Sequence, residues 1–156
     1  DDPSLNVRLL DFSDEYQPTR LVLDSQLKTR GSEKIFNLSG ENFVYTLMSN
    51  EPSGPHQDVL FVNENNGHVS LEEITIDLAN REFNEVLIEA GPNLNGAFLN
   101  QGLIDEIIVY LAPSILGNSS RGMFELPMLN ELSEAFRFYI ESIDQIGTDL
   151  RIVLRK

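Results

Sequence analysis

The stretch of the chain best suited to bind a small ligand is 89–97, which reads Glu-Ala-Gly-Pro-Asn-Leu-Asn-Gly-Ala. It stands between an apolar run that predicts a buried strand and a pattern that predicts a helix. The first turn of a helix presents backbone N–H groups without acceptors and the positive end of the helix dipole, so it can hold a phosphate without any lysine. Gly91 and Gly96 would let the backbone approach such a ligand closely. The same spacing also fits an ordinary turn between a strand and a helix.

Carboxylates and one arginine form a second set of candidates. Glu89 comes at the carboxyl end of the predicted strand, where ligands bind in open α/β sheets, although it can equally be a plain polar strand end. The chain opens with Asp1, Asp2 and Pro3, and Arg8 follows closely. An acid pair before proline is also a common turn signal, whereas arginine offers a bidentate fork for a phosphate.

Other catalytic chemistries find little support in the sequence. The chain has no cysteine, which excludes a disulfide framework, a thiolate zinc site and a cysteine nucleophile. His56 and His68 stand in turn-rich segments without ligand spacing, so we predict no metal site. Ser25 follows Asp24 but has no histidine near it in sequence to act as a base, so a serine nucleophile is not indicated.

Length and charge limit the class of protein. The 156 residues suit one α/β domain, and 25 acidic against 11 basic residues give a net charge of -14. This balance argues against a nucleic-acid ligand and against an anionic membrane surface, and no apolar run approaches the ~20 residues of a membrane span. We expect a cytoplasmic protein. Because the first residue is not methionine, we also expect the chain to be a piece of a longer polypeptide.

The elements that must position these residues alternate between strands and helices. Short apolar runs predict strands at 20–24, 43–48 and 59–62, and a loop follows at 63–67. Ser70 and Glu73 predict a capping box, with Ser70 as the N-cap and Glu73 reaching back to it, at the start of a helix over 71–81.

The second half of the chain predicts one more helix and several strands. A strand at 85–89 leads into a short helix that Gly102 closes, and 106–111 is a strand that Pro113 stops. Phe136, Phe138 and Ile140 alternate as in a half-buried strand, as do residues 150, 152 and 154, with a turn at 147–149. We therefore predict an α/β fold with a mixed, mostly parallel sheet flanked by helices and a C-terminal antiparallel hairpin.

Taken together, these blocks resemble one family, the C-terminal reductase domain of the bifunctional riboflavin-biosynthesis deaminase–reductase, which has a dihydrofolate-reductase-like fold. The matching blocks span the chain from end to end, and 31–80 is nondescript. They are 1–8, 20–25, 87–99, 102–113, 116–117, 121–122 and 147–150. The specific part is Glu-Ala-Gly-Pro-x-Leu-x-Gly followed by Gly-Leu-Ile-Asp-Glu.

The resemblance implies an oxidoreductase that transfers a hydride from NADPH to the ribosyl group of 5-amino-6-(5-phosphoribosylamino)uracil, giving the ribitylamino product. It implies NADP contacts at Asp1 and Ser25 and substrate contacts at Leu5, Arg8 and Glu89, with Glu89 also the candidate catalytic residue. The cofactor phosphates would rest on Gly91, Pro92, Asn93, Leu94, Asn95, Gly96 and Ala97.

The resemblance also implies a homodimer. It places the first strand and helix of the reductase domain upstream of residue 1, together with a zinc-dependent deaminase half. That half cannot be this chain, because its signature requires cysteine. Two other readings stay open, namely a reductase of the same fold that uses NADPH on a different substrate, and a non-catalytic nucleotide-binding or dimerisation module.

Overall fold

The computed structural model describes residues 2–9, 16–47 and 58–156, and the chain divides into two compact units. Unit 1 is Asp1–Glu85 and unit 2 is Val86–Lys156, and each is described by itself. Asp1, His56 and Met48, the last residue of one predicted strand, lie outside the described residues.

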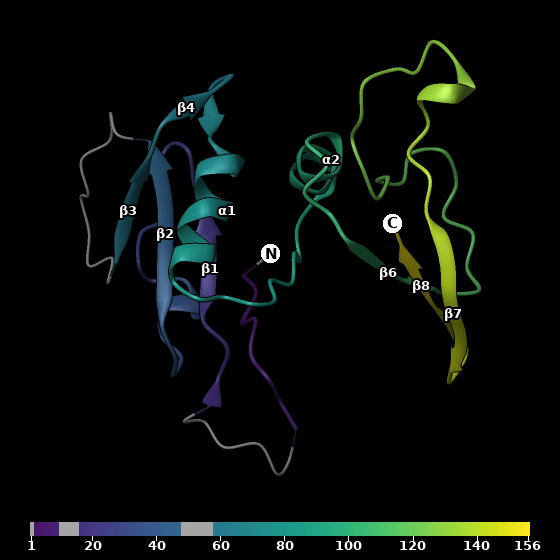
Figure 1. Ribbon diagram of the computed structural model, residues 1–156. Helices are drawn as coiled ribbons and strands as arrows, with labels where there is room; N and C mark the ends of the chain where they lie inside the picture. Colours follow the sequence, from purple (N-terminus) through teal and green to yellow (C-terminus); the bar gives the residue numbers. More distant parts are fainter. Residues whose placement is uncertain (1, 10–15, 48–57) are drawn as a thin grey trace. The chain divides into compact units, whose positions relative to one another are not determined.

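Unit 1 is built on a parallel sheet of three strands in the order β1-β2-β3 (Figure 1). The strands are β1 (Arg20–Leu23), β2 (Asn42–Leu47) and β3 (Val59–Val62), which confirms the strands predicted from the apolar runs. The central strand β2 is the most deeply buried, and Val44, Tyr45 and Thr46 are at most 1% exposed. Burial on both faces explains why its sequence is a nearly continuous apolar run instead of an alternating one.

Helix α1 (Leu71–Asn80) lies against one face of this sheet (Figure 1) and confirms the predicted helix. Its Leu71, Ile74 and Leu78 are buried. The Ser70 hydroxyl accepts a hydrogen bond from the Glu73 amide at 3.3 Å, as predicted. The second half of the predicted capping box is wrong, because both carboxylate oxygens of Glu73 accept from Asn63, from its amide at 2.6 Å and its side chain at 2.5 Å.

The predicted loop at 63–67 contains a small hairpin instead. Strands β4 (Glu64–Asn65) and β5 (His68–Val69) pair antiparallel around Asn66 and Gly67. These two residues have φ values of 52° and 81°, the double positive φ that a two-residue hairpin turn requires. The Asn-Gly pair was therefore the signal that the loop assignment overlooked. Unit 1 also contains a short 3-10 helix, η2 (Lys34–Phe36).

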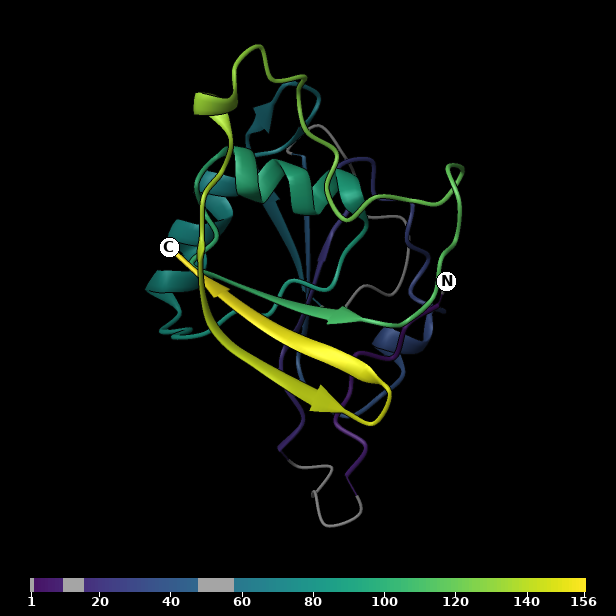
Figure 2. The same ribbon diagram turned by 90° about the vertical axis from the view of Figure 1, so that its right-hand side faces the viewer.

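Unit 2 contains helix α2 (Pro92–Asn100), the 3-10 helix η3 (Leu132–Glu134) and an antiparallel sheet in the order β6-β8-β7. The strands are β6 (Glu106–Leu111), β7 (Tyr139–Ile146) and β8 (Asp149–Arg155); Figure 2 shows the long yellow hairpin of β7 and β8 beside the green β6. Gly147, with φ 63°, turns the chain between β7 and β8 as predicted. Strand β7 begins at Tyr139, later than the alternation from Phe136 suggested.

The end of α2 also follows the prediction. Gly102 has φ 73°, its amide donates to Leu99 O at 3.0 Å, and the Leu103 amide donates to Phe98 O at 3.0 Å. This pair of bonds is the Schellman arrangement, which needs a residue in the left-handed region at the position of Gly102.

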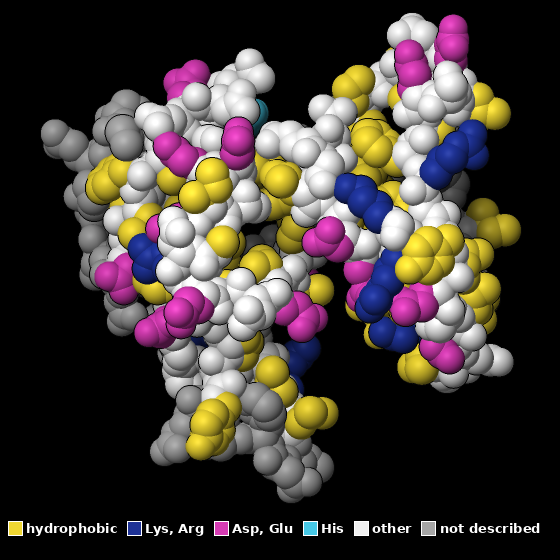
Figure 3. Space-filling view, viewed as in Figure 1, with side chains coloured by type: hydrophobic (Ala, Val, Ile, Leu, Met, Phe, Trp, Pro, Cys, Tyr) yellow, Lys and Arg dark blue, Asp and Glu magenta, His cyan; other side chains and the backbone are white. Residues whose placement is uncertain are grey.

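One face of the antiparallel sheet in unit 2 is aliphatic. The register sets Ile107, Leu154 and Ile140 side by side, and likewise Val109, Ile152 and Ile143. Ile140 and Ile143 are 60% and 55% exposed, and hydrophobic side chains are visible on the surface of unit 2 in Figure 3. Three hydrophobic residues of unit 2 are buried, namely Phe98, Leu99 and Val153.

The strand predicted at 85–89 is wrong. Residues 83–90 run without helix or strand assignment, and Leu87 is 73% exposed. A strand forms only through hydrogen bonds to a neighbouring strand, and 85–89 has no ladder partner among the described residues. The α/β class and the C-terminal antiparallel hairpin are nevertheless confirmed.

Candidate cofactor and substrate sites

The N-terminus of α2 is open to a ligand. Gly91 is its N-cap residue, with φ -78° and ψ 172°, and provides no side-chain cap. The first amide bonded within the helix is that of Asn95, which donates to Gly91 O at 3.1 Å. Pro92 has no N–H, and the amides of Asn93 and Leu94 have no acceptor inside the helix. No acidic residue occupies the first turn, so these two amides and the helix dipole favour an anion.

The two glycines of this segment have different roles. A Cβ at Gly91 would meet nothing within 4 Å, so the backbone there faces open space. A Cβ at Gly96 would lie 1.9 Å from the carbonyl oxygen of Glu125, and Gly96 is buried. Gly96 is therefore required by close packing of the chain against itself, whereas Gly91 leaves room for a ligand.

Segment 123–125 explains this packing. The Asn95 side-chain amide donates to Ala90 O and to Met123 O, both at 3.2 Å, and the Glu125 amide donates to Pro92 O at 2.9 Å. The side of α2 that carries Asn95 and Gly96 is thus occupied by the protein itself. No local spacing in the sequence indicated this, because the partners lie far apart along the chain. Ala97, half-buried, follows in the same helix.

Glu89 is exposed and lies in the extended segment just before Gly91. This position of Glu89 is compatible with a catalytic role and with a merely structural one. The predicted contact with the substrate therefore stays a prediction.

The predicted substrate contacts in unit 1 share one segment. Residues 2–9 form no helix or strand; Leu5 is half-buried with φ 45°, and Arg8 is exposed. Ser25 lies in the same unit, just after β1, and its hydroxyl accepts a hydrogen bond from the Val69 amide at 3.0 Å. The carboxyl end of β1 is where ligands bind in α/β sheets, which is compatible with the predicted NADP contact at Ser25.

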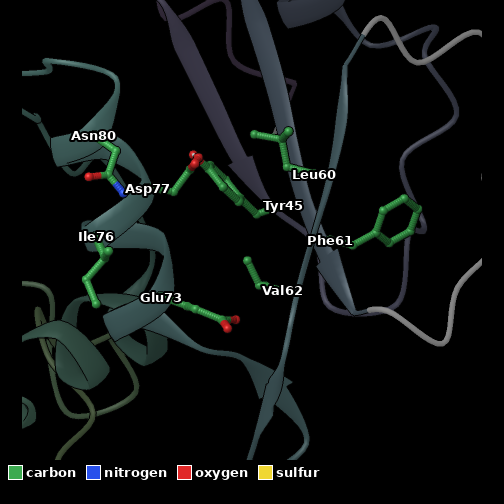
Figure 4. A pocket seen from close by; sticks show the side chains of 8 residues that line it. All are labelled: Tyr45, Leu60, Phe61, Val62, Glu73, Ile76, Asp77 and Asn80. Carbon is green, nitrogen blue, oxygen red and sulfur yellow. The ribbon is translucent and has the colours of Figure 1, made fainter.

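A hollow of about 300 Å³ lies between α1 and β3 in unit 1 (Figure 4). Its lining contains none of the predicted site residues and consists of Tyr45, Leu60, Phe61, Val62, Glu73, Ile76, Asp77 and Asn80. The Tyr45 hydroxyl donates to Asp77 Oδ2 at 2.7 Å. Burial and this bond to a carboxylate raise the pKa of Tyr45, so the phenol stays protonated. The hollow offers two carboxylates and no basic group, so it does not suit a phosphate.

Within the described ranges, no group of three or more acidic or histidine side chains could hold a metal ion. Nor does any helix there combine the length and apolarity needed to cross a bilayer.

The family with the description RibD C-terminal domain matches residues 1–152. The chain belongs to this family. It is 34% identical to the riboflavin biosynthesis protein RibD of Escherichia coli, over 96% of this chain and 44% of that protein. It is 30% identical to the 5-amino-6-(5-phosphoribosylamino)uracil reductase of Buchnera aphidicola subsp. Acyrthosiphon pisum, over 99% of this chain and 80% of that protein.

Solved structures agree with this assignment. Acinetobacter baumannii RibD superposes with a TM-score of 0.81 at 30% identity, over 99% of this chain and 43% of that one. The yeast riboflavin biosynthesis reductase Rib7 superposes with a TM-score of 0.69 at 19% identity, covering 99% and 68%, and shares the fold. This RibD C-terminal domain spans less than half the length of the RibD relatives named here.

Proposed function

We propose that this RibD C-terminal domain reduces the ribosyl group of 5-amino-6-(5-phosphoribosylamino)uracil with NADPH. The observation that carries the proposal is the open N-terminus of α2, which falls on the Glu-Ala-Gly-Pro block. The reductase of Buchnera aphidicola carries this activity in its name and is covered over 80% of its length. That name gives the substrate but no cofactor, and we propose NADPH as the hydride donor.

The amides of Asn93 and Leu94, with Gly91 beside them, would hold a cofactor phosphate. Residues 82–120 include no lysine or arginine, so the helix and its neighbours in sequence offer a phosphate backbone dipoles and no side-chain charge. Ser25 would contact the cofactor through its hydroxyl, and Asp1 keeps the same predicted role although it lies outside the described residues. Bound NADPH supplies the hydride.

On the substrate side, Arg8 is exposed and would bind the phosphate through the bidentate fork of its guanidinium. Leu5 would contact the substrate as well. Glu89 would orient the substrate and assist protonation of the ring oxygen of the sugar or of the imine nitrogen. Holding the reactants in register can supply roughly 7–11 kcal/mol of the barrier.

We also propose that the whole protein carries the first strand and helix of the reductase domain, and a deaminase half, before residue 1, and that it forms a homodimer. The exposed run at 85–89 supports the first part of this proposal. The run is apolar and extended but has no ladder partner in the described chain. We expect this of an inner strand whose neighbouring strand is missing.

The test is NADPH oxidation with the phosphoribosylaminouracil substrate, followed by absorbance. Arg8→Ala should raise the substrate KM roughly 10- to 100-fold, the loss expected for charged hydrogen bonds. Arg30→Ala, which removes another exposed arginine of unit 1, should leave it unchanged. Oxidation of NADPH only with a different carbonyl substrate would instead support another reductase of the same fold. Equal affinity for NADH and NADPH would refute the cofactor assignment.

A further inference from the structure

The segment with the predicted substrate contacts Leu5 and Arg8 has no regular structure of its own, since residues 2–9 form neither helix nor strand. An irregular segment fixes its side chains only through what its backbone is bonded to. The partners of residues 2–8 therefore decide how well Leu5 and Arg8 are placed.

The side chain of Gln17 binds this segment through both backbone groups of Val7. The Val7 amide donates to Gln17 Oε1 at 2.9 Å, and Gln17 Nε2 donates to Val7 O at 3.1 Å. The side chain of Gln17 thus bonds Val7 as a neighbouring strand would, with one donor and one acceptor. Val7 is the residue directly before Arg8.

The segment is held at its other end as well. Asp2 Oδ1 accepts a hydrogen bond from the Lys34 amide at the start of η2, at 2.9 Å. Leu5 lies between the two attachments with φ 45°, a conformation that side-chain-bearing residues seldom adopt and that persists only where the surroundings fix it. A strained residue between two fixed points indicates a segment with a defined shape.

Gln17 is itself braced by the start of the sheet. Arg20 on β1 is 2% exposed, and its guanidinium donates to Leu38 O at 3.1 Å and Ser39 O at 2.6 Å. The turn held in this way brings Gly40 against Gln17, since a Cβ on Gly40 would lie 3.2 Å from Gln17 Cβ. Arg20 on β1 thus holds the turn, the turn contacts Gln17, and Gln17 bonds Val7.

We propose that Gln17 is a positioning residue for substrate binding, acting through the backbone of Val7 on Arg8 and Leu5. The proposal rests on the proposed function, in which Arg8 and Leu5 contact the substrate. Both polar atoms of the Gln17 side chain bond Val7, so the proposed effect is exerted through the backbone of Val7.

The experiment compares Gln17→Met with the wild type in the full-length polypeptide. Methionine keeps the length of the side chain but forms neither bond. The substrate KM should rise roughly tenfold, the expected effect of losing two neutral hydrogen bonds, while kcat falls less than about twofold and the KM for NADPH stays the same. The matched control is Gln145→Met, which removes a glutamine bond to a backbone carbonyl, that of Gly147 at 3.2 Å, and should change neither KM.

A second variant separates positioning from general destabilisation. Gln17→Glu keeps an acceptor for the Val7 amide but sets a carboxylate oxygen against Val7 O, so its substrate KM should rise at least as far as that of Gln17→Met. If Gln17→Met instead raised both KM values and lowered the melting temperature in proportion, its role would be structural and the proposal would be wrong. An unchanged substrate KM would overturn it as well.

Arg8→Ala distinguishes this proposal from the one it rests on. If Arg8→Ala leaves the substrate KM unchanged, the proposed function is at fault. If Arg8→Ala raises the KM and Gln17→Met does not, only the role of Gln17 is wrong. If Gln17 acts through Arg8, the double variant should lose much less than the product of the two single losses, since additivity fails for residues that act together.

Discussion

The two α-helices of the described chain begin in opposite ways. Helix α1 begins at Ser70, whose hydroxyl accepts from the Glu73 amide, and its first turn contains Glu72 and Glu73. Helix α2 begins at Gly91, with proline in its first turn and neither a side-chain cap nor an acidic residue.

In the proposed function, this difference separates a helix start that serves stability from one that serves binding. At α1, a hydroxyl and two carboxylates already complement the exposed amides and the positive dipole end, so an outside anion would find the place occupied and repulsive. At α2 the amides of Asn93 and Leu94 have no side-chain cap, and we propose that a ligand complements them. A helix that begins at glycine forgoes only the few tenths of a kcal/mol by which a good side-chain cap exceeds glycine.

The largest effect should come from Gly96→Ala, which tests whether α2 is packed on one side and open only at its end. A Cβ at position 96 would lie 1.9 Å from Glu125 O, so backbone must move. Although alanine gains ~1 kcal/mol of helix propensity over glycine, we expect a net loss of roughly 3 kcal/mol in the free energy of unfolding, at the upper end for overpacking.

Urea unfolding followed by circular dichroism measures this loss. Gly91→Ala is the control, since its Cβ meets nothing within 4 Å, and it should cost less than ~1 kcal/mol. Equal unfolding midpoints for the wild type and Gly96→Ala would show that α2 is not packed against segment 123–125.

The next effect is on binding and comes from Gly91→Asp, which converts the open helix start into one like that of α1. The backbone at Gly91, with φ -78° and ψ 172°, accepts any residue. The new carboxylate would bond the free amides and repel a phosphate, so the Kd for NADPH should rise roughly tenfold, about 1.4 kcal/mol. The free energy of unfolding should rise by a few tenths of a kcal/mol.

Isothermal titration with NADPH checks the first value and urea unfolding the second. Gly91→Asn adds a cap of the same shape without charge, so it should weaken NADPH binding less than Gly91→Asp. If neither variant changed the Kd, the cofactor phosphate would not lie at α2.

The third prediction concerns the closed helix start. Ser70→Ala removes the cap of α1 and should lower the free energy of unfolding by ~1 kcal/mol, whereas Ser70→Gly should lower it by a few tenths. Both variants should bind NADPH with the wild-type Kd. A weaker affinity in Ser70→Ala would mean that the start of α1 also contributes to binding, and the contrast between the helices would fail.

What could be predicted from the sequence depends on how local the cause is. Ser70 was identified as a cap and Gly102 as the end of α2 because each acts on amides or carbonyls within one turn of itself. The parallel strands were found because buried strands read as apolar runs. The family blocks that carry the candidate site are likewise contiguous stretches.

Causes that lie far away along the chain left no readable pattern. The run at 85–89 has the same apolar sequence whether or not a neighbouring strand is present, so its missing ladder could not be foreseen. Glu73 binds Asn63 instead of reaching back to Ser70 because the chain folds Asn63 onto the helix start. The close approach of Gly96 to Glu125 is also a contact between residues far apart in sequence, so the sequence alone does not distinguish the role of Gly96 from that of Gly91.

The smallest effect concerns the C-terminal end of α1. It tests whether side chains of the protein stabilise this end of the helix as Ser70 stabilises its start. Asp77 Oδ2 accepts from the Tyr45 hydroxyl and from Arg81 Nε, each at 2.7 Å. Burial acts to raise the pKa of Asp77, but these hydrogen bonds outweigh it and hold the pKa below its ordinary value of 3.8. The folded state therefore favours the carboxylate, and Asp77→Asn should lower the free energy of unfolding by about 0.5 kcal/mol at neutral pH, as for other partly exposed ion pairs.

Because the folded pKa of Asp77 is depressed, this contribution is present above 3.8 and is lost as the pH falls through the lower folded value. Urea unfolding of the wild type and Asp77→Asn, repeated from neutral pH downward, should show the two free energies converging in that acid range. Tyr45→Phe, which removes one of the two donors, should reduce the difference that Asp77→Asn makes at neutral pH. If the difference in the free energy of unfolding stayed constant with pH, the C-terminal end of α1 would be held by packing alone. Stabilisation of α1 by polar side chains would then be confined to Ser70 at its start.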